Sequence, residues 1–229
     1  MSSHIATNTS WKVEGPKKSN KRKAADAGLD DDDDQPITIP FRLPNLGGSS
    51  SIYSHANHIY FNDDITRESA FALNRELRHV ENRLKHAAFT FDLNNDSVPI
   101  FLHLTTNGGL IDAAFSVVDC MNNLSVPVYT IIDGFVASAG TLISLAGKKR
   151  YIEENAYFLI HQLSSGVWGK MQEITDEYEN LKKLANHLVS YYVDKTKMRK
   201  KEIQEQLKHD ITWNATEVIA RGIAERYIK

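Results

Sequence analysis

Residues 126–146 read VPVYTIIDGFVASAGTLISLA, and this stretch decides the fold. Its first part, Val126 to Ile132, is apolar and rich in β-branched residues, which favours a buried strand. Its last part, Thr141 to Ala146, favours a helix, and a small-residue segment with one serine, Ser138, lies between them. Such a turn places its side chain beside free backbone N–H groups, where an anion is favoured. The stretch predicts either an acyl-transfer nucleophile at Ser138 or a plain tight turn with Ser138 as the helix N-cap.

The segments around this stretch alternate between strand and helix patterns. Strands are also predicted at residues 58–61, 99–104, 150–152 and 156–160, and helices at residues 66–88, 110–121, 138–147, 171–195 and 200–207. A further helix opens at Asn214 or Ala215, and a terminal strand follows Ala224. Alternation of this kind is typical of parallel strands joined by helical crossovers. The sequence therefore predicts an α/β fold that begins near Ser51.

Residues 1–50 differ in composition from the rest of the chain. A basic cluster at residues 17–23 is followed by an acidic run at residues 30–34, three prolines and a Gly/Ser stretch. Few apolar residues are available to offset the entropy of ordering such a segment. We expect a disordered charged extension over residues 1–50 and one folded domain over residues 51–229. The extension is interpreted as a solvated tail, with a localisation signal, a nucleic-acid arm or a removable propeptide as alternatives, and residues 37–46 could dock as an extended strand.

Composition and charge exclude several classes of protein. The 229 residues carry a formal net charge of −2, so the chain as a whole has no nucleic-acid footprint. The single cysteine, Cys120, lies in an apolar helical pattern, which predicts a buried side chain, no disulfide and a reducing compartment. No run reaches 18 apolar residues and the first residues lack an apolar signal-peptide stretch, so we expect neither a membrane span nor secretion. We expect a protein of the cytoplasm, an organelle matrix or a viral host's cytoplasm, without membrane contact.

Nucleotide and metal motifs are missing from the sequence. Six residues separate Gly140 from Gly147, where a P-loop has four, and Lys149 stands at the place of its Ser or Thr. No GxGxxG, HExxH or pair of cysteines occurs, and His55 and His58, three positions apart in a stretch expected to be mobile, are a weak metal signal. We expect no cofactor and no metal in this chain.

Catalysis by Ser138 requires a general base and a carboxylate that orients it. His161 directly follows the apolar strand predicted at residues 156–160, and strand ends in α/β folds point toward the site crevice. Asp210 is one candidate acid, with a role as the cap of the next helix as its alternative. The full set of candidates, among which the residue pattern alone does not choose, is Glu173, Asp176, Glu177, Asp194 and Asp210.

A second small-residue turn, TTNGG at residues 105–109, ends the strand before the one that leads to Ser138. Parallel strands end on the same edge of a sheet, so the two turns are expected to be neighbours. Backbone N–H groups of Gly109 and Ala139 could then form an oxyanion hole. The alternative is that Gly108 and Gly109 only allow the chain to turn tightly into its helix.

Four motifs in this order resemble the proteolytic subunit of the Clp ATP-dependent protease, a self-compartmentalising serine peptidase. Residues 106–109, TNGG, are similar to the family's Ser-Pro-Gly-Gly motif, and residues 134–140, GFVASAG, match Gly-x-x-Ala-Ser-x-Gly. Residues 160–162, IHQ, match its Ile-His-Gln motif, and the 29-position step from Gly109 to Ser138 is also that of the family. Asp210, with the helix opening at residues 214–217, has the layout of the family's acid. The resemblance covers about residues 55–229.

The resemblance implies an α/β fold of the Clp-protease/crotonase-like type, a spiral of ββα units with a protruding long-helix handle. It implies that Ser138 is the nucleophile, His161 the base and Asp210 its orienter, with Gly109 and Ala139 as the oxyanion donors. It further implies seven-membered rings stacked as a tetradecamer, interlocked by the helix that begins near Met171. Unfolded polypeptides would be the substrates, and ATP would be used only by a separate AAA+ unfoldase.

Two departures from the family pattern accompany the resemblance. Asn107 stands where the family has Pro, and residues 163–166, LSSG, stand where it has Pro-Leu-Gly-Gly. These departures indicate a divergent member, such as a viral or organellar one, with a role in capsid maturation as a secondary interpretation. Two alternatives of another class are a non-catalytic ring scaffold or regulator and a crotonase-fold enzyme acting on an acyl-CoA. A reactive serine separates the peptidase from both.

Overall fold

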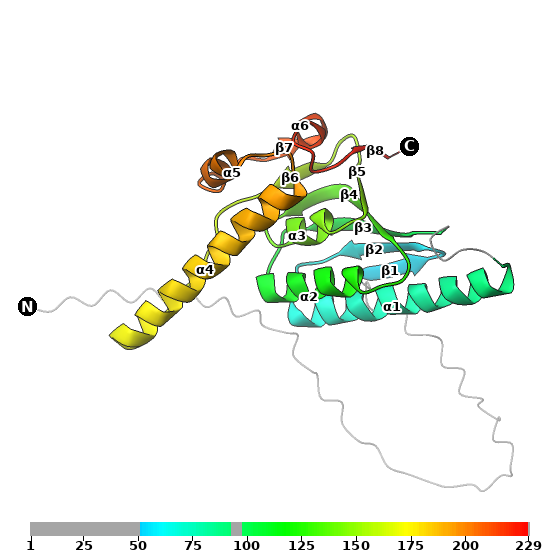
Figure 1. Cartoon of the computed structure of the whole chain (residues 1–229), viewed down its shortest axis with the longest axis horizontal. Helices are drawn as coiled ribbons and strands as arrows, with labels where there is room; N and C mark the ends of the chain where they lie inside the picture. The colour runs from blue at the N-terminus through cyan, green and yellow to red at the C-terminus, as the bar shows by residue number, and fades with distance from the viewer. Residues whose placement is uncertain (1–50, 93–97, 229) are drawn as a thin grey trace, which may run out of the picture. The chain divides into compact units, whose positions relative to one another are not determined.

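A computed structural model describes residues 51–92 and 98–228 of the chain (Figure 1). The strands form one sheet in the order β1-β2-β3-β4-β5-β8, with β6 beside β4 and β7 beside β6. The strands are β1 (Ile52–His55), β2 (His58–Asn62), β3 (Ile100–Thr106), β4 (Val128–Ala137), β5 (Lys149–Ile152), β6 (Tyr157–Leu159), β7 (Trp213–Asn214) and β8 (Arg226–Tyr227). The helices are α1 (Arg67–Thr90), α2 (Ile111–Asn122), α3 (Gly140–Leu145), α4 (Met171–Lys195), α5 (Lys200–Gln206) and α6 (Ala215–Ala220). The extension predicted over residues 1–50, with the strand expected at residues 37–46, lies outside the described residues.

Strands β2, β3, β4 and β5 are parallel and carry the centre of the sheet. Helix α1 connects β2 to β3 and α2 connects β3 to β4, and both lie on the same face of the sheet (Figure 1). Thr66 begins α1 as a capping box, in which its hydroxyl accepts from the Ser69 N–H while the Ser69 hydroxyl accepts from the Thr66 N–H. The α/β fold predicted from the alternating pattern is confirmed.

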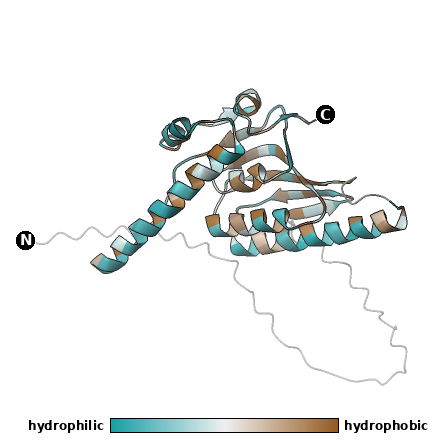
Figure 2. Ribbon diagram, in the orientation of Figure 1, coloured by the Kyte–Doolittle hydropathy of each residue, from teal (hydrophilic) through white to brown (hydrophobic). Residues whose placement is uncertain are grey.

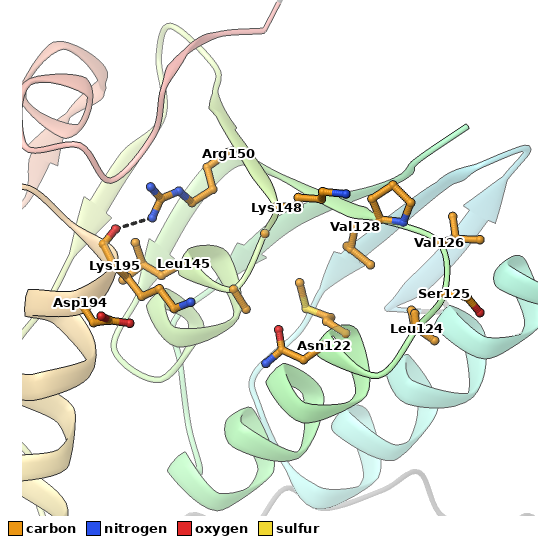
Figure 3. A pocket seen from close by; sticks show the side chains of 14 residues that line it. Asn122, Leu124, Ser125, Val126, Val128, Leu145, Lys148, Arg150, Asp194 and Lys195 are labelled. Atoms are coloured by element: carbon orange, nitrogen blue, oxygen red, sulfur yellow. Dashed lines mark hydrogen bonds between the residues drawn. The ribbon is translucent and has the colours of Figure 1, made fainter. Parts of the chain in front are cut away.

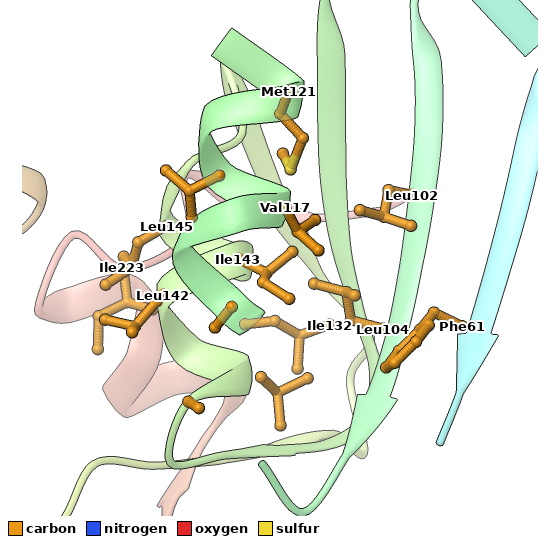
Figure 4. Close-up of a cluster of buried hydrophobic side chains, with 14 of the residues drawn as sticks. Phe61, Leu102, Leu104, Val117, Met121, Ile132, Leu142, Ile143, Leu145 and Ile223 are labelled. Carbon is orange, nitrogen blue, oxygen red and sulfur yellow. The ribbon is translucent and has the colours of Figure 1, made fainter. Parts of the chain in front are cut away.

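The main core lies between this sheet face and the helices that cover it (Figure 4). Leu102 and Leu104 of β3 face Val117 and Met121 of α2, and Ile143 of α3 packs beside them. All these side chains are buried, as the period-two and period-3.6 patterns require of residues on the inner face. Cys120 is also buried, and burial raises the pKa of its thiol, so it behaves as the small apolar side chain that was predicted.

Helix α4 projects away from the sheet (Figure 1). It runs over Met171–Lys195, the range predicted from the sequence, and apolar residues alternate with polar ones along it (Figure 2). Only its C-terminal part is packed on the core, where Leu188, Val189 and Tyr192 are buried. The predicted long-helix handle is therefore present, with its N-terminal half solvent-exposed.

Strand β4 is longer than predicted, and α3 is shorter. The predicted strand ended at Ile132, but β4 continues to Ala137 because its second half pairs with β6 through Phe135–Tyr157 and Ala137–Leu159. Helix α3 consequently starts at Gly140 instead of Ser138. A partner strand that is distant in sequence extended the element, which no local pattern could indicate.

The stretch around His55 and His58 is a β-hairpin, and the expectation that it is mobile is wrong. Strand β1 pairs antiparallel with β2, and the short turn between them contains Ala56 with φ of +50°. Two-residue hairpin turns usually carry Asn-Gly, Asp-Gly or a glycine at the first central position, which here is Ala56. The Ala56-Asn57 turn lacks that signal, so the hairpin was missed.

None of the helices in residues 51–92 and 98–228 combines the length and the apolar character needed to cross a bilayer.

Candidate active site

Ser138 lies at the sharp junction between β4 and α3, in a left-handed backbone conformation. Its φ is +53°, which is unusual for a residue with a side chain and costs of order 1–3 kcal/mol unless the surroundings hold it. The Ser138 N–H donates to the carbonyl of Leu159 at the end of β6, at 3.0 Å. The N-cap of α3 is Ala139, and no side chain caps this helix. The alternative interpretation of Ser138 as an ordinary N-cap is therefore wrong.

The glycine turn after β3 packs directly against the Ser138 turn. A Cβ atom added to Gly108, whose φ is +101°, would lie 2.5 Å from the Ser138 Cβ atom, closer than two such atoms can approach. Gly109 has a φ of +144°, and a Cβ atom there would overlap the carbonyl oxygen of Ile65. Both positions therefore require glycine, because the two turns and Ile65, which precedes the N-cap of α1, share the same space.

Two backbone N–H groups beside Ser138 are free to bind a ligand. The hydrogen bonds next to Gly109 run from the Ile65 N–H to the Gly108 carbonyl, at 2.7 Å, and from the Leu110 N–H to the Ile65 carbonyl, at 2.8 Å. The Gly109 N–H takes part in neither of these two hydrogen bonds. Among the hydrogen bonds of the described residues, the N–H groups of Gly109 and Ala139 have no acceptor. Both residues line one cavity with Ser138, as the oxyanion-hole hypothesis requires.

His161 lines the same cavity as Ser138, which has a volume of about 260 Å³. It follows the buried Ile160 at the end of β6, the short strand that pairs with the second half of β4. The pairing of β4 with β6 thus brings together two residues that are 23 positions apart in the chain. No hydrogen bond joins the Ser138 hydroxyl to His161 in the described part of the chain. Such bonds are often loose in an unliganded site and tighten on substrate binding.

Asp210 is the acid that the fold brings to His161. Its Oδ1 atom lies 3.7 Å from His161 Nδ1, which is beyond a hydrogen bond but within ion-pair range. The Asp210 side chain is 80% exposed, whereas that of His161 is 28% exposed. The alternative role of Asp210 as a helix cap is wrong, because Asn214 caps α6 by accepting from the Glu217 N–H.

The other candidate acids serve elsewhere in the fold. Glu173 accepts from the Lys170 N–H at the start of α4, and Asp176 accepts from the Gln172 side chain one turn away. Glu177 also lies on α4, and Asp194 lines a different cleft. Asp210 is the only acid paired with His161 among the salt bridges of the described residues.

Asn107, which stands in place of a proline, is part of the cavity wall. Its side-chain amide donates to Asp64 Oδ1 at 3.3 Å, so it ties the glycine turn to the segment before α1. The turn is held a second time by the Gly108 N–H, which donates to the Thr106 hydroxyl at 3.0 Å. These two bonds supply the local rigidity that a proline ring would otherwise give.

A cleft of about 550 Å³ lies at the start of β4, whereas Ser138 follows the end of this strand. Figure 3 shows the side chains that line the cleft. Its wall includes Val128 of β4, and the guanidinium of Arg150 crosses it to donate to the carbonyl of Lys195 at the end of α4. Burial lowers the pKa of Arg150. Among its described lining residues there is neither a histidine nor a cysteine. Its serine, Ser125, donates its hydroxyl to Glu81 Oε1 at 2.8 Å, so among the described lining residues no serine is paired with a histidine base.

A second histidine–carboxylate pair, absent from the sequence analysis, lies on the sheet face opposite the helices. His103 Nδ1 of β3 is 3.4 Å from Asp133 Oδ2 of β4, and His103 Nε2 is 3.0 Å from His58 Nδ1. Tyr60 stacks on His103, with ring centroids 4.2 Å apart. The strand register aligns these residues across three strands, so only knowledge of the strand pairing could have revealed them.

Comparisons with known proteins agree with this fold and show the family of the chain. The family model described as Clp protease matches residues 54–229. The ATP-dependent Clp protease proteolytic subunit 2 of Treponema denticola is 32% identical over 133 residues, which cover 57% of this chain and 66% of that relative. The proteolytic subunit of Streptococcus suis is 33% identical and covers 59% of this chain and 71% of that relative. For proteolytic subunit 1 of Chlamydia trachomatis the identity is 25%, over 74% and 85%. The chain therefore belongs to the Clp protease family of peptidases.

Proposed function

We propose that this chain is a serine endopeptidase that hydrolyses unfolded polypeptides through Ser138, His161 and Asp210. The observation that carries the proposal is the composition of one cavity. A serine in a left-handed turn, a histidine and two backbone N–H groups that have no acceptor within residues 51–92 and 98–228 line the same space of about 260 Å³. This combination supplies a nucleophile, a base and electrostatic stabilisation of an oxyanion, which acyl transfer requires.

The reaction follows from these roles. Ser138 Oγ attacks the carbonyl carbon of the peptide bond while His161 accepts the hydroxyl proton, and Asp210 stabilises the imidazolium that forms. The carbonyl oxygen becomes an oxyanion, which accepts hydrogen bonds from the N–H groups of Gly109 and Ala139. Collapse of the tetrahedral intermediate breaks the C–N bond, and His161 returns the proton to the leaving amine. Water then attacks the carbonyl carbon of the acyl-enzyme while His161 accepts its proton. The ester bond to Ser138 Oγ breaks, and His161 returns the proton to Ser138.

The proposed assembly is a pair of stacked seven-membered rings. Support comes from the exposed apolar side chains at the N-terminal end of α4 and in the loop before it, where Trp168 is 99% exposed and Met171 is 79% exposed. A copy of this helix from the opposite ring would cover them, because exposed clusters of large apolar residues mark interaction sites. The relatives named above are subunits of ATP-dependent proteases, and the present sequence has no nucleotide motif of its own. We therefore propose a separate AAA+ unfoldase as the partner.

A fluorophosphonate probe tests the function directly. The assembled wild-type protein should be labelled at Ser138, as mapped by mass spectrometry, and should cleave a fluorogenic peptide. Ser138→Ala should lose all labelling and lower the hydrolysis rate by about 10⁴-fold or more, because the nucleophile is removed.

The matched control is Ser164→Ala, which removes the hydroxyl of another serine lining the same cavity and should still be labelled at Ser138. Light scattering on the same samples should give a particle far larger than the 25.9 kDa chain. An assembled particle that takes no label would refute the peptidase proposal and favour a ring scaffold. A stable monomer at micromolar concentration would refute the ring assembly.

A further inference from the structure

The peptide unit that joins Ser138 to Ala139 is held at its carbonyl end by Thr141. The Ser138 carbonyl oxygen accepts two hydrogen bonds, one from the Thr141 N–H at 3.0 Å and one from the Thr141 hydroxyl at 2.6 Å. The first bond belongs to the turn itself, and many residues could supply it. The second requires a side-chain hydroxyl on the residue after Gly140, and the Thr141 side chain is fully buried.

The Thr141 hydroxyl is in turn bound by Tyr192 of α4, with 2.7 Å between the two oxygens. A backbone carbonyl only accepts hydrogen bonds, so the Thr141 proton is committed to the Ser138 carbonyl. The Tyr192 hydroxyl must therefore be the donor to Thr141. Burial raises the pKa of Tyr192 to about 12, so this hydroxyl keeps its proton. The result is a series of two hydrogen bonds, in which Tyr192 donates to Thr141 and Thr141 donates to the Ser138 carbonyl.

The same peptide unit carries the Ala139 N–H at its other end. None of the described peptide bonds is cis, so the Ser138 carbonyl and the Ala139 N–H point in opposite directions within one plane. Fixing the carbonyl direction therefore fixes the direction of the N–H. Hydrogen bonds that end on a carbonyl also polarise its peptide unit and strengthen its N–H as a donor.

We infer that Thr141 and Tyr192 are positioning residues that orient and polarise the Ala139 N–H as an oxyanion donor. This inference rests on the proposed peptidase function, in which that N–H binds the oxyanion. Neither hydroxyl is assigned a contact with the reacting atoms, and both act through the Ser138–Ala139 peptide. The resemblance to known peptidases assigned no role to either residue. Because Tyr192 belongs to α4, the projecting helix contributes to the site through its packed end.

Removal of single hydroxyl groups tests the inference. Thr141→Val should lower kcat for a fluorogenic peptide by about tenfold with KM nearly unchanged, because the lost hydrogen bond matters most in the transition state. Tyr192→Phe leaves the Thr141 bond in place and should lower kcat by about threefold. Thr141→Ser keeps the hydroxyl and should retain most of the wild-type kcat. Combining Thr141→Val with Tyr192→Phe should lower kcat little further, because the series of hydrogen bonds is already interrupted at Thr141.

Tyr191→Phe is the matched control. Tyr191 precedes Tyr192 on α4 and donates to the Leu142 carbonyl of α3 at 2.9 Å, so this variant also removes one tyrosine hydroxyl from the α4–α3 contact. It leaves the Ser138 peptide untouched and should keep the wild-type kcat. The inference is overturned if Thr141→Val stays within twofold of wild type, if Thr141→Ser is as slow as Thr141→Val, or if Tyr191→Phe is as slow as Tyr192→Phe.

Hydrogen exchange separates this inference from the proposed function. Amide exchange in the peptide that spans Ser138 to Thr141 should be faster in Thr141→Val than in wild type and Tyr191→Phe, because the turn is held less firmly. If the wild-type protein neither cleaves peptides nor reacts with the fluorophosphonate, the proposed function fails. In that case unchanged exchange in Thr141→Val also refutes the holding of the Ser138–Ala139 peptide by Thr141. Faster exchange would establish that Thr141 holds this peptide, without a catalytic role.

Discussion

The described residues contain two histidine–aspartate pairs, one on a face of the sheet and one beyond the end of β6, and the tighter of them is the one without a nucleophile. His103 and Asp133 are 3.4 Å apart, on the face opposite the helices, and His103 is nearly buried under Tyr60. His161 and Asp210 are 3.7 Å apart, and Asp210 is largely exposed. Only His161 shares a cavity with a serine and with backbone N–H groups that lack an acceptor.

The comparison shows that proximity of an imidazole and a carboxylate does not identify a catalytic site. His103 stacks on Tyr60 and contacts His58 through its Nε2 atom, so its ring faces these side chains and not a nucleophile. His161 follows the end of β6 and shares a cavity with residues of the glycine turn and of the Ser138 turn. Reactivity therefore depends on which groups surround the pair.

Replacing the two histidines in the same way should produce the largest contrast. His161→Phe should lower the rate of peptide hydrolysis by about 10³-fold or more, because the general base is lost. His103→Phe keeps a ring stacked on Tyr60 and should stay within about threefold of wild type. Steady-state hydrolysis of a fluorogenic peptide measures both. A greater loss in His103→Phe, in a particle of normal mass, would show that the catalytic histidine has been misassigned.

Replacing the two aspartates should produce a smaller contrast. Asp210→Asn should lower kcat by about 10²-fold, less than in a buried triad, because this carboxylate is exposed and solvent screens its charge. Asp133→Asn should leave kcat within about twofold, since the groups around it take no part in the reaction. Full activity in Asp210→Asn, or an equal loss in Glu173→Gln, would contradict the assignment of the acid.

The pH dependence of stability should show the smallest difference. Burial lowers the pKa of His58 below its ordinary value of 6.5, and the neighbouring charges of His103 and His55 lower it further. The unfolded chain therefore takes up the His58 proton at a higher pH than the folded one. As a result, the contribution of neutral His58 to the free energy of unfolding is complete above about pH 6.5 and declines as the pH falls. Between about pH 7.5 and 5.5, the drop in Tm should be about 2 °C smaller in His58→Phe than in wild type.

Calorimetry at several pH values measures this difference. His86→Phe removes an exposed imidazole from α1 and serves as the control for the loss of one histidine. Equal slopes of Tm against pH in His58→Phe and wild type would show that the His58–His103 contact is not a site of proton-linked destabilisation.

Much of the fold follows from local patterns. The apolar period along α4 predicted a helix over residues 171–195, and the structure has that range, because long amphipathic helices carry many repeats of one signal. Strand β1 was missed since its Ala56 turn lacks the usual glycine, and β7 was missed since it has only two residues. Short strands are stabilised by their partners, and a local window does not contain the partner.

The residues of the site divide in the same way into those that a local sequence pattern indicates and those that it does not. Ser138, His161 and the two glycines stand out as small or polar residues at strand ends, where α/β folds collect functional groups. The acid does not stand out, because ten aspartates and glutamates follow His161 and only the family resemblance selected Asp210 among the five candidates. Thr141 and Tyr192 carry no local signal at all, since a threonine inside a helix and an aromatic residue on an apolar face are ordinary features.

The sequence by itself determined the strand–turn–helix unit at Ser138, the small-residue turn at residues 105–109, and the order of the motifs. These properties follow from the preferences of neighbouring residues, which act over a few positions. The tertiary structure alone decided that β6 extends β4, that Asp210 approaches His161, and that Tyr192 reaches Thr141 across 51 positions. Contacts of that kind form only when distant segments are packed together, so no local pattern contains them.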